Sequence, residues 1–176
     1  PRPAPPPAPA PAHAAAVAAV PATKGDDWAY LSSGTWSLLG LELPKPLVNE
    51  TVRKAKYTNE VGFGGTSRFL KNLVGLWVLQ ECRREWMEKG EVSDYGEIVK
   101  LALKAPSLRS FIRPDDVRFA KRGDMVAKVQ AFCRETKQPI PKTHGEIARC
   151  VLESLALLYR VEMDGMEKLT MPSIST

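Results

Sequence analysis

The sequence predicts an α/β fold in which short, mainly antiparallel strands come first and a bundle-like layer of helices follows. Two apolar runs that suit strands flank a turn of small polar residues near position 34. Beyond position 66, apolar residues recur at intervals of three and four, as on one face of a helix. Helix-capping signals precede the later apolar runs. We therefore expect three antiparallel strands before the helices.

The first two strands are expected at Trp28–Leu31 and Trp36–Leu41, where the short polar turn between them favours a hairpin. The third is Tyr57–Val61, because glycines follow it directly. Between the second and third strands we expect a solvated loop. This loop carries the densest basic cluster of the chain, Arg53, Lys54 and Lys56.

Four helices are expected after the strands. They span, in order, Thr66–Lys89, Asp94–Lys104, Asp124–Thr136 and a last segment that begins at Thr143. Asp94 and Glu97 have the spacing of a capping box, in which the two side chains satisfy the first N–H groups of a helix. Thr143 and Glu146 repeat that spacing. The two pairs therefore predict where the second and fourth helices begin.

The composition is that of an ordinary globular domain. The chain has 176 residues, of which 44% are hydrophobic and 26% are charged. This length accommodates one domain with a sizeable core. No run approaches the roughly 18 consecutive apolar residues of a membrane helix. The net charge of +5 is modest, and basic residues alternate with acidic ones, so we expect neither nucleic acid nor a membrane as a partner.

Proline alternates with alanine over the first eleven residues, a pattern that favours an extended, solvated segment. We expect a disordered tail at 1–13, a folded part at 14–170 and a second disordered tail at 171–176.

The three cysteines, Cys82, Cys133 and Cys150, are widely spaced, and the chain has only two histidines as possible co-ligands. This pattern indicates no metal site and no disulfide framework, and it favours a reducing, cytoplasmic compartment.

The turn Ser32-Ser33-Gly34-Thr35 suits contact with phosphate. Glycine allows the backbone to approach a ligand closely, and hydroxyl and N–H groups donate to phosphate oxygens. Most turns of this composition only connect strands. From the turn alone, both interpretations stay open.

Three longer strings are more specific: WAYLSSGTWSLLGLEL, TNEVGFGGTSRFLKNLVGLWVLQECRREW and THGEIARCVLESLALLYR. Together, and in this order, they resemble the FGGY carbohydrate kinases, most closely the members that phosphorylate L-rhamnulose. The resemblance implies an actin-like, ribonuclease-H-like ATPase fold, of which residues 14–170 form a partial C-terminal domain. It also implies phosphoryl transfer from ATP, with Mg²⁺, to the 1-hydroxyl of the ketose L-rhamnulose.

The same resemblance implies roles for individual residues. Thr35, with Ser33 and Gly34 beside it, matches the position that contacts the phosphates of ATP. Gln80 matches a position that contacts the nucleotide, and Asn72 one that contacts the sugar. Eight residues are a little over two helical turns, so both side chains could face a cleft from one helix. By spacing alone they are equally ordinary polar residues on a helix surface.

Further residues have two interpretations. Asn59, Glu60 and Gly65 stand between a strand and a helix start, where anions bind well, although glycines there also serve turns. Asp115 and Asp116 favour a turn before a helix over a metal pair. Cys133 and Cys150 match two family positions where cysteines come close, so a disulfide is possible, although not expected in the cytosol.

The sequence departs from the family in its expected catalytic base. Kinases of this type carry His-Asp-Thr before a stretch that resembles Ala14–Ala22, and here Pro11-Ala12-His13 stands there, with Ala12 in the place of the aspartate. The family's N-terminal domain and its glycine-rich adenosine motif have no counterpart. We therefore expect a fragment without turnover of its own. The alternatives are a non-catalytic interaction module, or another FGGY kinase of the xylulose, fuculose or glycerol type.

Overall fold

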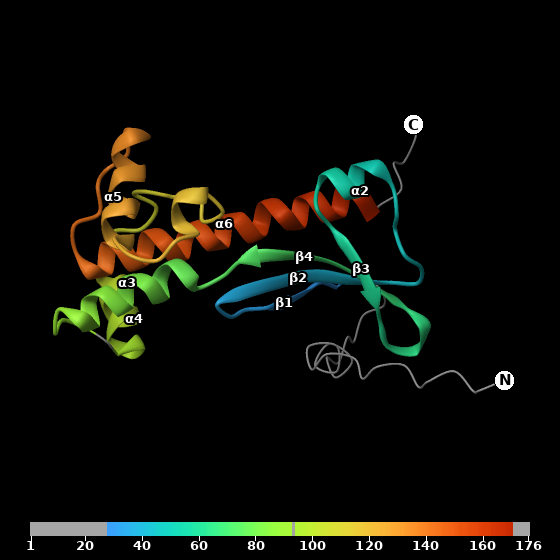
Figure 1. Cartoon of the computed structure of the whole chain (residues 1–176), viewed down its shortest axis with the longest axis horizontal. Coiled ribbons are helices and arrows are strands. Elements are labelled where there is room, and N and C mark those ends of the chain that lie inside the picture. The colour runs from blue at the N-terminus through green and yellow to red at the C-terminus, as the bar shows by residue number, and fades with distance from the viewer. Residues whose placement is uncertain (1–27, 93, 171–176) are drawn as a thin grey trace. The chain divides into compact units, whose positions relative to one another are not determined.

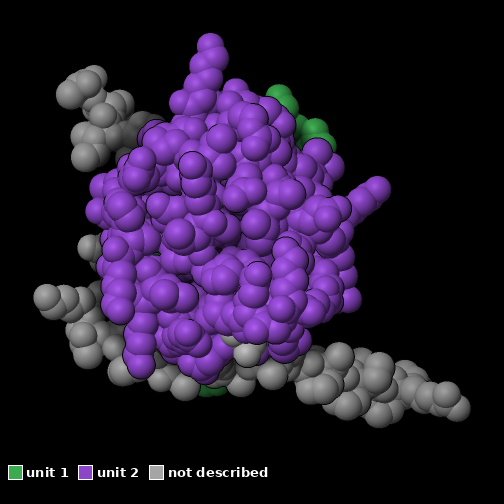
Figure 2. Space-filling view, turned by 90° about the vertical axis from the view of Figure 1, so that its left-hand side faces the viewer, with its two compact units in different colours: residues 1–32, 38–72 green, residues 33–37, 73–176 purple. Residues whose placement is uncertain are grey.

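A computed structural model of the chain describes residues 28–92 and 94–170. The chain divides into two compact units. Unit 1 comprises residues 1–32 and 38–72, and unit 2 comprises residues 33–37 and 73–176; Figure 2 shows them in green and purple. The two expected tails and the Ala14–Ala22 stretch lie outside the described residues, so the structure does not test them.

A four-stranded sheet has the order β1-β2-β4-β3 (Figure 1). The strands are β1 (Tyr30–Ser32), β2 (Trp36–Leu43), β3 (Thr58–Val61) and β4 (Ser67–Val74). β1 pairs antiparallel with β2, and β3 pairs antiparallel with β4. The expected hairpin and third strand are confirmed. The expected number of three strands is wrong, because β4 is a fourth.

The long helix expected at Thr66–Lys89 is wrong in its first half. The segment begins as strand β4, and only α3, Trp77–Glu88, is helical. Phe69 and Leu70 are 0% and 1% exposed, and successive side chains of a strand point to opposite faces. Both faces of β4 are therefore covered. A strand buried on both faces is a continuous apolar run, which periodicity does not distinguish from a helix.

Unit 1 also contains a short helix that the sequence analysis missed. The segment expected as a solvated loop holds α2, Glu50–Lys54, whose first turn is capped by Asn49. The basic cluster lies on and just after this helix, and Arg53 forms an exposed ion pair with Glu50 at 2.8 Å. Five residues are too few for a clear apolar stripe. A one-turn helix, η1 (Phe63–Gly65), lies between β3 and β4.

Unit 2 is helical. Its helices are α3, α4 (Tyr95–Lys104), α5 (Met125–Glu135) and α6 (His144–Thr170), and the one-turn helix η2 spans Val117–Phe119 (Figure 1). They enclose an apolar core of buried side chains that includes Val78, Trp86, Ile98, Val129 and Ile147. No described helix combines the length and apolar character needed to cross a membrane.

Both predicted helix starts are confirmed, with a complete capping box at α6 and a single N-cap bond at α4. The Asp94 carboxylate accepts from the N–H of Glu97 at 2.9 Å and starts α4. At α6, the Thr143 hydroxyl accepts from the N–H of Glu146 at 3.2 Å, and the Glu146 carboxylate accepts from the N–H of Thr143 at 3.1 Å. One N–H group at the start of α4 and two at the start of α6 therefore have side-chain acceptors.

The start of α5 is built differently. Asp124 precedes this helix in a left-handed conformation, with a φ of 52°, and its side chain makes no capping hydrogen bond. Glu85 of α3 takes over that function, because its carboxylate accepts from the N–H groups of Met125 and Val126. The expected range Asp124–Thr136 is confirmed to within one residue at each end.

Candidate functional site

The turn at Ser33–Thr35 is bonded to the start of α3. The carbonyl oxygen of Gly34 accepts from the N–H of Leu76 at 2.8 Å. The carbonyl oxygen of Thr35 accepts from the N–H groups of Gly75 at 3.1 Å and Trp77 at 3.3 Å. These three hydrogen bonds fix the backbone of the turn against the residues that open the helix. All of these residues belong to unit 2.

Gly75 makes this approach possible. A Cβ atom at this position would overlap the carbonyl oxygen of Gly34 and would lie 2.6 Å from the Oγ of Ser37. Any other residue would push the turn away from α3. The sequence analysis did not single out Gly75, because a glycine between two apolar runs looks like an ordinary break. The need for a glycine at this position comes from the close approach of Gly34, which lies 41 residues earlier in the chain.

The start of α3 is capped by the backbone of the Thr35 turn and not by a side chain. Leu76 stands at the N-cap and makes no side-chain capping bond, and the first turn contains no acidic residue. The first N–H groups of a helix lack partners within the helix and carry a partial positive charge. The Thr35 side chain beside them is exposed. A hydroxyl beside the positive end of a helix is an arrangement that favours a phosphate group.

Gln80 lies on the second turn from this end of α3, where its side chain is partly buried and its N–H donates to the carbonyl of Leu76 at 2.8 Å. The structure therefore brings Gln80 and the Thr35 turn to the same end of one helix. Asn72 is exposed on β4, in unit 1. The expectation that Asn72 and Gln80 share one helix is wrong, since a strand and a helix carry them.

A cavity of about 340 Å³ opens beside Thr35. It is lined mainly by apolar groups, among them Val74 and Trp77, and by the segment from Pro114 to Ala120. The indole Nε1 of Trp77 donates to the carbonyl of Phe119 at 2.9 Å, which ties that segment to α3. The Thr35 side chain is thus at the edge of a space large enough for part of a small ligand.

Asp115 and Asp116 are part of this cavity wall, and they form ion pairs with Arg113 and Arg118. The backbone N–H of Arg118 donates to Asp116 at 2.9 Å, and this bond, helped by the Arg118 guanidinium, holds the pKa of the carboxyl below its ordinary value. The one-turn helix η2 follows directly. The predicted turn before a helix start is confirmed. Across the described ranges, no three potential metal ligands gather at one point.

Two of the other candidates are engaged in structural contacts. The side-chain amide of Asn59 bonds both backbone groups of Leu47, at 2.9 Å and 2.8 Å. Glu60 pairs with the buried guanidinium of Arg68 at 2.6 Å. Gly65 has a φ of 89°, which glycine adopts readily. These contacts favour structural roles for all three residues.

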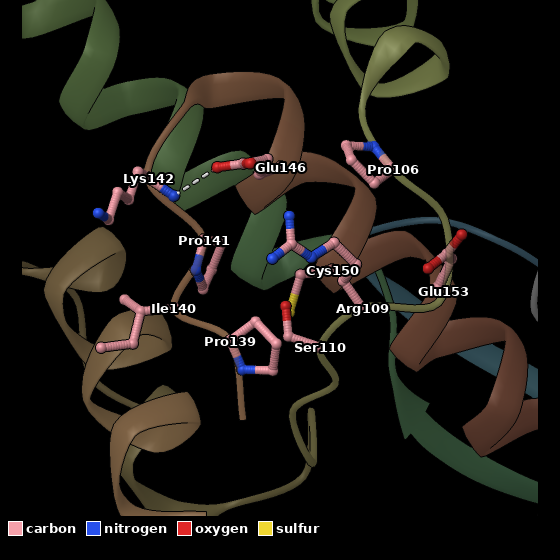
Figure 3. A pocket seen from close by; sticks show the side chains of 10 residues that line it. All are labelled: Pro106, Arg109, Ser110, Pro139, Ile140, Pro141, Lys142, Glu146, Cys150 and Glu153. Carbon is pink, nitrogen blue, oxygen red and sulfur yellow. Dashed lines mark hydrogen bonds between the residues drawn. The ribbon is translucent and has the colours of Figure 1, made fainter. Parts of the chain in front are cut away.

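A second cavity of unit 2, about 270 Å³ in volume, contains Cys150 and Ser110 (Figure 3). Cys133 and Cys150 are free thiols joined by a hydrogen bond. That bond lowers the pKa of Cys133, whereas the same bond and burial raise the pKa of Cys150. The two cysteines are therefore neighbours, as the resemblance implies, and no disulfide joins them in this structure.

Residues 29–176 match the FGGY family of carbohydrate kinases, C-terminal domain. The chain is 45% identical to a rhamnulokinase of Enterococcus faecalis over 83% of this chain and 29% of that protein. It is 44% identical to a rhamnulokinase of Bacteroides thetaiotaomicron over 91% of this chain and 32% of that protein. A rhamnulokinase of Bacillus subtilis is 39% identical over 88% of this chain and 31% of that protein.

The chain thus spans about a third of the length of these curated relatives. The matched domain is part of the actin-like, ribonuclease-H-like ATPase fold, so the predicted fold class is confirmed.

Proposed function

We propose that this chain, which belongs to the FGGY family of carbohydrate kinases, is part of an ATP-dependent kinase of L-rhamnulose. The complete enzyme would transfer a phosphoryl group from ATP to the 1-hydroxyl of the sugar and form L-rhamnulose 1-phosphate. The observation that carries the proposal is the hydrogen bonding of the Ser33–Thr35 turn to the start of α3, which has no side-chain cap. The names of the three relatives support L-rhamnulose as the sugar.

In this proposal Thr35 donates to a phosphate oxygen of ATP, and Ser33 and Gly34 contribute N–H groups of the same turn. Gln80 contacts the nucleotide from α3, and Asn72 contacts the sugar from β4. The partial positive charge at the start of α3 supports an anion at this point, because it favours phosphate. The exposed Thr35 hydroxyl supports a direct contact.

Mg²⁺ would be held mainly by the phosphates of ATP, since this ion usually keeps several waters and needs only one or two protein carboxylates. When bound, it neutralises the negative charge that develops during phosphoryl transfer. The described residues include no cluster of three possible metal ligands, which fits a metal that arrives with its nucleotide. The free Cys82, Cys133 and Cys150 support a cytoplasmic location for the enzyme.

The chain on its own should not turn over. The aspartate that would accept the proton of the sugar hydroxyl has Ala12 in its place, and this position lies outside the described residues. A coupled assay of ADP release with L-rhamnulose measures this directly. A rate on the order of 1 s⁻¹, within the usual range of enzymes, would contradict the proposal for the isolated chain.

Nucleotide binding tests the site itself. We expect ATP with Mg²⁺ to bind the chain weakly, and Thr35→Ala to reduce its affinity about tenfold, the usual effect of losing one hydrogen bond to a charged group. Ser107→Ala removes an exposed hydroxyl from the loop after α4 and is the matched control. Equal affinity in all three proteins, or no binding to any of them, would favour a non-catalytic interaction module.

A further inference from the structure

The hydroxyl of Tyr159, on α6, reaches the chain segment that follows the Thr35 turn. Its oxygen lies 2.7 Å from the Oγ of Ser37, and the two residues are 122 positions apart in the sequence. Tyr159 is partly buried and packs against the helical core of unit 2. Ser37 is 0% exposed. A hydrogen bond therefore joins a rigid helix to the base of the turn.

The Ser37 hydroxyl is enclosed by the protein. The space on one side is closed by Gly75, where an added Cβ atom would lie only 2.6 Å from the Oγ. Among the described residues, Tyr159 is the one group that hydrogen-bonds to this hydroxyl. A buried hydroxyl without a partner is costly. The bond to Tyr159 therefore stabilises the buried position of the Ser37 hydroxyl.

Ser37 follows Thr35 by two residues, so the turn is held from two directions. On one side, three backbone hydrogen bonds join Gly34 and Thr35 to the start of α3. On the other side, the Ser37 hydroxyl is held by α6 through Tyr159. The backbone of the turn is thus fixed, while the Thr35 side chain stays exposed. A group that must meet a ligand with a tolerance of about 0.5 Å needs support of this kind.

We propose that Tyr159 is a positioning residue for the nucleotide contact of Thr35, acting through Ser37. The proposal rests on the proposed function of the turn. It adds to that function a residue of α6 that does not itself touch the nucleotide. The phenol oxygen is the atom responsible, since the ring packs against the core whether or not it carries a hydroxyl.

The test variant is Tyr159→Phe, which keeps the ring and removes the oxygen. We expect its affinity for ATP with Mg²⁺ to fall about fivefold to tenfold, near that of Thr35→Ala. We also expect the amide protons of Gly75, Leu76 and Trp77 to exchange faster, because their acceptors in the turn become mobile. Both are measured on the full 176-residue chain, by calorimetric titration and by hydrogen exchange followed with NMR.

Ser154→Ala is the matched control. The Ser154 hydroxyl lies on the same helix, is 2% exposed, accepts from the N–H of Ile112 at 2.9 Å and donates to the carbonyl of Cys150 at 2.5 Å. Removing it destabilises α6 without touching Ser37. We expect Ser154→Ala to lower the melting temperature and to leave the ATP affinity unchanged. Reduced affinity in both variants to the same extent would overturn the positioning role, since general destabilisation would explain it.

The double variant Ser37→Ala with Tyr159→Phe adds a second criterion. It removes both hydroxyls and leaves no unpaired polar group, so its affinity should be no lower than that of Tyr159→Phe alone. Fully additive losses would overturn the proposal, because they would show that the two residues act independently.

The outcomes also separate this proposal from the function on which it rests. If Thr35→Ala weakens ATP binding and Tyr159→Phe does not, the positioning role is wrong and the proposed function stands. If Thr35→Ala has no effect, the proposed function fails, and the nucleotide role of Tyr159 fails with it. Exchange rates at Gly75, Leu76 and Trp77 that stay unchanged in Tyr159→Phe would show that the turn does not depend on α6, whatever the affinity.

Discussion

Two helix starts in unit 2 differ in how their first N–H groups are satisfied. α6 begins with a complete capping box, in which Thr143 and Glu146 exchange hydrogen bonds. α3 begins at Leu76 and Trp77 with no side-chain cap and no acid in its first turn. The N–H groups of Leu76 and Trp77 donate instead to the backbone carbonyls of Gly34 and Thr35. α6 thus has a carboxylate at its start, whereas the positive end of α3 adjoins the exposed Thr35 side chain, which makes α3 the more promising place for an anionic ligand.

The largest effect is expected at the glycine that lets the turn approach α3. Gly75→Ala would force the new Cβ against the carbonyl of Gly34, which should cost about 1–3 kcal/mol of stability and abolish ATP binding. Urea unfolding and ATP titration measure the two effects. Gly90→Ala is the control at the other end of α3, where a Cβ meets no atom and only the φ of 71° opposes it. It should cost about 1 kcal/mol and leave binding intact. Normal ATP binding by Gly75→Ala would contradict a role for the start of α3 in binding ATP.

A carboxylate added near the start of α3 should reduce ATP affinity without reducing stability. Gln80→Glu places a negative charge near the positive end of α3, which should leave the melting temperature equal or slightly higher. The same charge should repel the phosphates and reduce ATP affinity about fivefold to tenfold. Calorimetric titration and thermal unfolding, run on one preparation, report both. If the new charge left the ATP affinity unchanged, the phosphates of ATP would not bind at this end of α3.

Loss of the cap at α6 should affect stability alone. Thr143→Ala removes the hydroxyl that accepts from Glu146 and should cost about 1 kcal/mol. ATP affinity should not change, because the Glu146 carboxylate already occupies this helix start. Chemical denaturation gives the first value and titration the second. A loss of affinity equal to that of Thr35→Ala would show that the two helix starts are not functionally distinct.

The smallest effect is a pH dependence at the same cap. The backbone N–H groups of Lys142 and Thr143 donate to Glu146 and lower the pKa of its carboxyl. A lowered pKa means that this stabilisation is present above the unfolded-state pKa, about 4.3, and is lost as the pH falls through the folded-state value. The stability difference between the wild type and Glu146→Gln should therefore be present at pH 7 and shrink below about pH 4. A difference that grows on acidification would contradict the assignment.

Local signals predicted the caps but not the contacts between distant segments. The caps at Asp94 and Thr143 are predictable because donor and acceptor lie within four residues. The sequence pattern of β4 resembles that of a helix because both of its faces are buried and its alternation is hidden. The start of α5 depends on Glu85, forty residues earlier, which no local pattern announces.

The candidate site shows the same limit. The strings that resemble the family marked Thr35 and Gln80, and the structure brings both to one end of α3. Neither Gly75 nor Tyr159 was singled out for the site. Their roles follow from the space between the turn and α3 and from a bond across 122 residues. Asn72 was assigned to the wrong kind of element, although its expected role is not affected by that error.

An NMR titration of the ¹⁵N-labelled chain with ATP and Mg²⁺ tests the central claim most directly, because it reports on both helix starts at once. The account predicts that the largest amide shifts occur at Thr35 and over the first turn of α3, and that the amides of Thr143 and Glu146 do not move. Shifts of equal size at both helix starts, or shifts confined to residues outside the Thr35 turn and α3, would contradict it.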